Sequence, residues 1–268
     1  MSTKVANLTG YITDCGGEGL AADSEHMRNA SFDTNFFGKN KKVTMQPGFY
    51  VLRGAPAAGK TAFMLQMCSD FAQNAQKHIT YYTFKESTRE LVTRSLACAP
   101  AVGKSNKQSF MKISDCESCI KSSTQSMDKV QSVFCEYGYR IYFAECSANM
   151  KVHDIVASVE NNAIGNVIFI DGLQDLAFTD SFADMLKQLK IFQKEHNLVV
   201  IASFSDAYAD DADKRAIMNY ADVVWDLETD GMDDDSNKTS IRLTWVKNRF
   251  DFVPDTVYAY YPEYNIFL

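Results

Sequence analysis

Short apolar runs recur along the chain, separated by polar segments long enough to form helices. The runs are FYVLR at 49–53, ITYYTF at 79–84, RIYFAE at 140–145, VIFID at 167–171 and LVVIAS at 198–203. Such runs are typical of strands covered on both faces, as in a parallel sheet. The clearest helix is expected over 181–195, with Asp180 or Ser181 as its candidate N-cap. Its apolar stripe is Phe182, Met185, Leu186, Leu189 and Phe192. The alternation predicts an α/β fold, a mainly parallel sheet with helices on both faces.

After ADVVWDL, which ends at residue 227, the pattern changes from continuous apolar runs to alternation. In SIRLTWVKNRF, at 240–250, apolar side chains occupy every second position from Ile241 to Trp245. This period of two is typical of a half-exposed strand, and TVYAYYPEYNIFL at 256–268 is a candidate partner. We therefore expect a C-terminal antiparallel extension. The acidic stretches SDAYADDAD and ETDGMDDDSNK, between 205 and 238, are expected to be solvated loops.

Charge and composition exclude several classes of protein. The chain has 268 residues and a net charge of −7, so it has no global basic footprint for nucleic acid. It contains no uncharged apolar stretch of about 18 residues, and its first residues form no apolar signal core. Seven cysteines, an odd number, scattered through apolar segments indicate reduced thiols. These features favour a cytoplasmic protein that does not span a membrane.

The sequence GAPAAGKT follows the first apolar run and fits GxxxxGK[ST] at every fixed position. Small residues let successive backbone N–H groups converge on phosphate oxygens. The strand before the loop and the helical spacing after it favour a P-loop over a chance loop rich in glycine and alanine. Lys60 would contact the β- and γ-phosphates of ATP, and the Thr61 hydroxyl would bind Mg²⁺. The predicted nucleotide-binding residues are Gly54, Ala55, Pro56, Ala57, Ala58, Gly59, Lys60 and Thr61.

A P-loop also requires a carboxylate for the metal at the end of another buried strand. Asp171 ends the run NVIFID and is the candidate for this Walker B position. An aspartate that only caps the next turn is the alternative interpretation. The P-loop upstream favours the metal ligand.

Six segments, taken in order, resemble the RecA-like ATPase domain of DnaB-type replicative helicases over roughly residues 32–268. They are SFDTNFFGKNKKVTMQPGFYVLRGAPAAGKTAFMLQM, YYTFKESTRELVTRSLA, VIFIDGLQDL, VVIASFS, NYADVVWDLE and IRLTWVKNRF. The resemblance implies a RecA-like P-loop NTPase domain over residues 36–268. Residues 1–35 form an N-terminal arm in this interpretation, where the family carries a helical domain.

The resemblance also implies roles for three basic residues. Lys247 and Arg249, in VKNRF, would point at the γ-phosphate bound by the neighbouring subunit, as an arginine finger that acts in trans. The alternative is a solvated basic pair at the end of a strand. Arg94 falls where the family has an arginine near the nucleotide. An enzyme completed in trans assembles with itself, into a ring or filament, and a hexamer is expected.

Several departures from the family weaken the expectation of a motor that moves along DNA. Lys85 aligns with the glutamate that activates water, and Glu86 comes one residue later, so a bulge would be needed to place Glu86 there. Phe204 stands where the family has a glutamine that senses the γ-phosphate. In the family, such loops line a central pore and hold single-stranded DNA through backbone and basic contacts. The first of them here, AFTD at 177–180, has no basic residue. The second, near ADDADKRAIMNY, has only Lys214 and Arg215 as cations.

Three functions remain open at this point. The first is an ATP-driven helicase-type motor that acts on DNA in replication and binds single-stranded DNA weakly. The second is a DnaB-like nucleotide-binding protein whose unwinding is weakened or lost, an assembly or regulatory ATPase of a phage or mobile element. The third is a RecA-like ATPase that acts on a protein. The catalytic residues expected are Lys60, Glu86, Lys247 and Arg249, with ATP and Mg²⁺ as cofactors.

Overall fold

The computed structural model describes residues 4–7, 31–37, 42–98, 111–122, 136–162, 165–232, 237–251 and 253–268. In this part of the chain, a ten-stranded sheet has the order β1-β6-β5-β7-β8-β4-β9-β10-β11-β12. Five predicted strands are confirmed. They are β4 (Gly48–Gly54), β5 (Ile79–Thr83), β6 (Ile141–Glu145), β7 (Val167–Asp171) and β8 (Val199–Ser205). Together with β9 (Val223–Met232) they pair in parallel, as the continuous apolar runs predict.

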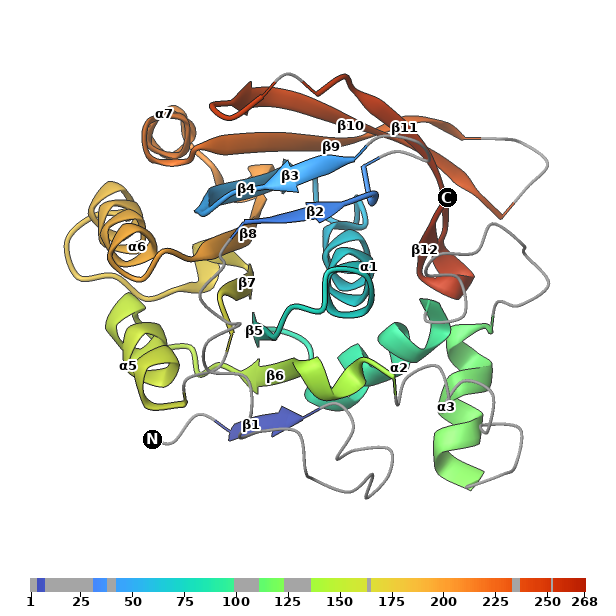
Figure 1. Ribbon diagram of the computed structural model, residues 1–268. Coiled ribbons are helices and arrows are strands. Elements are labelled where there is room, and N and C mark those ends of the chain that lie inside the picture. The colour runs from blue at the N-terminus through green and yellow to red at the C-terminus, as the bar shows by residue number, and fades with distance from the viewer. Residues whose placement is uncertain are drawn as a thin grey trace.

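Helices cover both faces of the sheet (Figure 1). One layer contains α1 (Lys60–Gln73), α2 (Thr88–Cys98) and α3 (Ile113–Ser122). The other contains α5 (Val152–Asn162), α6 (Phe182–Glu195) and α7 (Asp211–Tyr220). The predicted N-cap is confirmed for α6, because Ser181 Oγ accepts a hydrogen bond from the Asp184 backbone N–H. Each layer encloses its own apolar cluster, which includes Phe63 on the first face and Leu186 on the second.

The C-terminal antiparallel extension is present. β9 pairs with β10 (Thr239–Asn248), β10 with β11 (Thr256–Tyr261), and β11 with β12 (Ile266–Phe267). The expectation of solvated loops was wrong in two places. Residues from Asp211 onward begin α7, with Asp210 as its N-cap, and β9 continues through the acidic segment to Met232.

Strands near the N-terminus join this fold. β1 (Lys4–Asn7) pairs antiparallel with β6 at the edge of the large sheet. β2 (Phe32–Thr34) and β3 (Val43–Met45) form a separate two-stranded sheet, and Phe32 belongs to the apolar cluster that contains α1. Within the described ranges, no helix is long and apolar enough to cross a membrane.

Candidate active site

The loop between β4 and α1 has the backbone geometry that phosphate binding requires. A Cβ on Gly54 would lie 2.6 Å from the Leu227 carbonyl oxygen, so a side chain does not fit there. Gly59 has φ of 88°, in the left-handed region that favours glycine. Helix α1 begins at Lys60 without a side-chain cap and without an acidic residue in its first turn. Its first backbone N–H groups therefore remain available to an anion.

The Lys60 ammonium lies over this loop. Its Nζ donates hydrogen bonds to the carbonyl oxygens of Gly54, at 2.9 Å, and Ala55, at 2.7 Å. Burial lowers the pKa of Lys60, and the charges of Asp171 and Asp206 oppose this shift. A cation held here is placed to bind phosphate oxygens, as the sequence predicts.

The predicted metal ligands Thr61 and Asp171 are in contact. Thr61 Oγ1 donates to Asp171 Oδ2 at 2.8 Å, across the gap between α1 and β7. Hydroxyl and carboxylate oxygens suit Mg²⁺, which keeps several waters and takes its other ligands from nucleotide phosphates. Among the residues described, no three His, Cys, Asp or Glu side chains gather as a metal site. The donor set therefore fits a cation that arrives with a nucleotide.

Two further hydroxyls hold Asp171, and the sequence pattern does not reveal them. Tyr81 OH donates to Oδ2 at 2.9 Å, and Ser203 Oγ donates to Oδ1 at 2.6 Å. Both side chains are buried in neighbouring strands, where a tyrosine or a serine is easily read as core packing. The strand register places both near Asp171: Ser203 pairs with it directly, and Tyr81 lies two residues before Thr83, its partner in β5, on the same side of that strand.

Glu86 follows β5 and lies beside this cluster. Its Oε1 forms an ion pair with Arg94 Nη1 at 2.8 Å. Its Oε2 is buried and has no hydrogen-bond partner in the described part of the chain. Burial raises the pKa of Glu86, Arg94 lowers it, and the charge of Asp171 raises it further. Arg94, predicted to lie near the nucleotide, thus contacts the candidate base.

The side chain of Lys85 pairs with a different partner from that of Glu86. Its Nζ pairs with Asp175 Oδ2 at 2.9 Å, and its side chain is 59% exposed. Asp175 belongs to the segment that follows β7. The half-buried carboxylate after the end of β5 is therefore that of Glu86, although Lys85 aligns with the glutamate of the family.

The end of β8 carries serines on the side of Asp171. Phe204 faces the other way, is 1% exposed, and packs against Phe182 of α6 with ring centroids 5.4 Å apart. Ser203 contacts Asp171, and Ser205 shares its side of the strand because side chains alternate. The Ser205 hydroxyl is buried and lacks a hydrogen-bond partner among the described residues. Phe204, which stands where the family has a glutamine, therefore packs away from Asp171, and the two serines that flank it lie on the side of Asp171.

The loops that follow β7 and β8, at the carboxyl ends of these strands, are acidic. Residues 172–181, after β7, contain Asp175 and Asp180, and residues 206–210, after β8, contain two more aspartates. Neither segment contains lysine or arginine. The expectation that Lys214 and Arg215 belong to the second loop was wrong, because both lie within helix α7.

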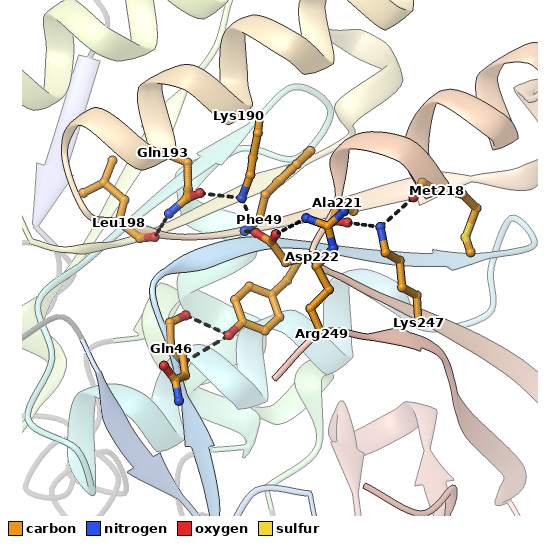
Figure 2. Close-up of polar contacts among 11 residues, drawn as sticks. Gln46, Phe49, Lys190, Gln193, Leu198, Met218, Ala221, Asp222, Lys247 and Arg249 are labelled. Atoms are coloured by element: carbon orange, nitrogen blue, oxygen red, sulfur yellow. Dashed lines mark hydrogen bonds and ion pairs between the residues drawn. The ribbon is translucent and has the colours of Figure 1, made fainter. Parts of the chain in front are cut away.

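Lys247 and Arg249 lie toward the end of the sheet away from the P-loop. Figure 2 shows their surroundings. Asn248 pairs with Val223, which pairs with Tyr50 near the start of β4, whereas the P-loop follows the end of β4. Four residue steps separate Tyr50 from Gly54, roughly 13 Å along the strand, and the P-loop extends beyond Gly54. Arg249 therefore cannot reach the P-loop of its own chain, which is the geometry that action in trans requires.

The two basic side chains have different surroundings. Lys247 Nζ donates to the carbonyl oxygens of Met218, at 2.6 Å, and Ala221, at 2.5 Å, at the C-terminal end of α7. The Arg249 side chain is 56% exposed, and its Nη1 lies 3.4 Å from Asp222 Oδ1. Of these two residues, Arg249 is the more accessible to a neighbouring subunit.

The fold and the loop together define a P-loop NTPase with a RecA-like sheet. The family model of the DnaB-like helicase C terminal domain matches residues 34–254, and the chain belongs to this family. None of the curated protein sequences matches the chain significantly.

Solved structures show the same fold at low sequence identity. One solved ATPase domain is 18% identical with a TM-score of 0.65, over 84% of this chain and 85% of that one. A DnaB-like replicative helicase, described with its interactions with primase, is 17% identical with a TM-score of 0.66, over 83% of this chain and 57% of that one. The flagellar accessory protein FlaH from Methanocaldococcus jannaschii is 12% identical with a TM-score of 0.53, over 80% of this chain and 85% of that one.

Proposed function

We propose that this chain is a Mg²⁺-dependent ATPase of helicase type that hydrolyses ATP between subunits of a ring or filament, with a hexamer as the expected assembly. The contact between Thr61 and Asp171, beside Lys60 in the P-loop, carries the proposal. These three side chains are the minimum that a P-loop enzyme uses to hold phosphates and metal. ATP with Mg²⁺ would supply the activated phosphoryl group.

Glu86 is proposed as the general base. Its Oε2 would accept the proton of the attacking water, while Arg94 holds Oε1 in place. Lys60 would bind the phosphate oxygens, and Arg249 of the neighbouring subunit would stabilise the charge that develops on the transferred phosphoryl group.

Lys60→Ala tests the site. We expect the variant to lose binding of ATP with Mg²⁺ at concentrations where the native chain is saturated, because the loop keeps its shape but loses its cation. Titration with a fluorescent ATP analogue measures this. Lys187→Ala, an exposed lysine of α6, is the control and should bind as the native chain does. Equal affinity in Lys60→Ala would rule the site out.

For the partner of the ATPase we propose single-stranded DNA, bound weakly, in replication. A second candidate is an assembly or regulatory ATPase with weakened or lost unwinding. The acidic loops at 172–181 and 206–210 favour the second candidate. A pore that moves along single-stranded DNA needs lysines or arginines that face the DNA phosphates.

ATP turnover with and without single-stranded DNA separates the two candidates. A motor acting on DNA should be stimulated by it, and its affinity should fall steeply with salt because each neutralised phosphate releases counterions. Turnover that single-stranded DNA leaves unchanged, together with no measurable binding in low salt, would select the assembly ATPase.

A further inference from the structure

The buried carboxylate of Asp222 is shared by three cationic or N–H donors (Figure 2). Its Oδ2 accepts hydrogen bonds from the Phe49 backbone N–H, at 2.9 Å, and from Lys190 Nζ at shorter range. Its Oδ1 lies 3.4 Å from Arg249 Nη1. Asp222 therefore joins the start of β4, helix α6 and the end of β10 at one point.

The two ion pairs of Asp222 differ in strength. Lys190 is 13% exposed in its side chain, and Gln193 Oε1 also accepts from its Nζ at 2.8 Å, so its ammonium is held by two side-chain oxygens. The Arg249 contact is long for a charged hydrogen bond, which is normally about 2.7–2.9 Å. Most of the charge of Asp222 is thus neutralised by Lys190.

The pairing of Lys190 with Asp222 leaves the Arg249 side chain loosely held. A buried carboxylate without a lysine partner would hold the nearest guanidinium tightly, because an uncompensated buried charge is unfavourable. With Lys190 in place, two contacts hold Arg249 in the described part of the chain. Its backbone N–H donates to the Asp222 carbonyl at 3.2 Å, and its side chain makes the long contact. Its guanidinium keeps most of its capacity to bind another anion.

We propose that Lys190 is a positioning residue for the finger: by neutralising Asp222 it leaves Arg249 able to reach a nucleotide phosphate on the neighbouring subunit. This inference rests on the proposed function in trans. Lys190 itself lies on α6, is mostly buried, and need not contact the neighbour.

Lys190→Met tests the inference. We expect turnover to fall about tenfold, within the range of coupling in one ion-pair network, because Asp222 then captures Arg249. ATP affinity should stay unchanged, since the P-loop lies at the other end of the sheet. Lys187→Met, on the exposed side of α6, is the matched control and should keep native turnover.

Rescue distinguishes positioning from a structural role. In Lys190→Met combined with Asp222→Asn, the carboxylate charge is removed while the amide oxygen can still accept from the Phe49 N–H, and turnover should return to near the native value. Asp222→Asn alone should keep at least native turnover. Loss of turnover in that single variant, failure of the rescue, or native turnover in Lys190→Met would each overturn the inference. If Arg249→Ala keeps native turnover, the proposed function in trans fails, and the inference fails with it.

Discussion

At the residue scale, the proposed hydrolysis of ATP depends on the arrangement of Glu86. Lys85 and Glu86 are neighbours in sequence, yet they point to different partners. Lys85 pairs with Asp175, whereas Glu86 is held by Arg94 and keeps one buried oxygen without a partner among the described residues. A lysine at the aligned position therefore does not by itself remove the base.

Glu86→Gln should trap ATP. We expect turnover to fall by at least about 10²-fold, as for loss of a general base, while ATP affinity stays close to native. Single-turnover measurements on bound ATP report both quantities. Lys85→Gln is the neighbouring control and should have a mild effect. A large loss in Lys85→Gln with none in Glu86→Gln would reverse the assignment.

The pH dependence of turnover follows from the surroundings of Glu86. A base acts only when ionised, so turnover should fall as the pH drops through its pKa, which burial raises above the ordinary 4.5. The Arg94 guanidinium lowers this pKa. Arg94→Gln should therefore move the acid limb of the pH–rate profile to higher pH, whereas a shift to lower pH, or none, would contradict the role of Arg94.

The sequence predicted some of these residues and missed others for a physical reason. The P-loop and Asp171 were predictable because glycines, a lysine and a hydroxyl at fixed spacing have one common use. Tyr81 and Ser203 were missed because hydroxyls in buried strands become visible as ligand holders only when the pairing of β5, β7 and β8 is known.

At the element scale, strands with continuous apolar runs were predicted well, and acidic segments were not. Helix α7 begins in a run of aspartates, where Asp210 accepts from the Asp213 N–H and the acidic first turn suits the positive end of a helix. The sequence pattern of these aspartates predicts a solvated loop instead. Their charge indicates exposure to solvent. The exposed side of an amphipathic helix meets this requirement as well as a loop does.

Lys247 should act mainly on the stability of this region. Its ammonium donates to two carbonyl oxygens at the C-terminal end of α7, where a cation also interacts favourably with the negative end of the helix dipole. We expect Lys247→Met to lower the free energy of unfolding by about 1–2 kcal/mol. Denaturant titration measures this. Arg249→Ala, whose side chain is half exposed, should lose much less, and equal losses would show that the two residues share one role.

At the scale of the whole molecule, the sheet separates the proposed nucleotide site from the proposed arginine finger. The P-loop, Asp171 and Glu86 gather at the carboxyl ends of the parallel strands, and Arg249 lies near the start of β4. A single chain cannot bring them together, because β4, β9 and β10 are hydrogen-bonded neighbours in one sheet and hold the two ends apart. Head-to-tail contacts between identical chains would place one end against the other and extend to a ring or filament.

Mixing two inactive variants tests this account most directly. Lys60→Ala lacks the phosphate cation, and Arg249→Ala, expected to lose roughly 10³-fold in turnover, lacks the finger. In an equal mixture, about a quarter of head-to-tail interfaces would join an intact P-loop to an intact Arg249. ATP turnover of the mixture should therefore rise well above that of either variant alone. Turnover no higher than the mean of the two separate variants, in a preparation shown to exchange subunits, would contradict catalysis in trans.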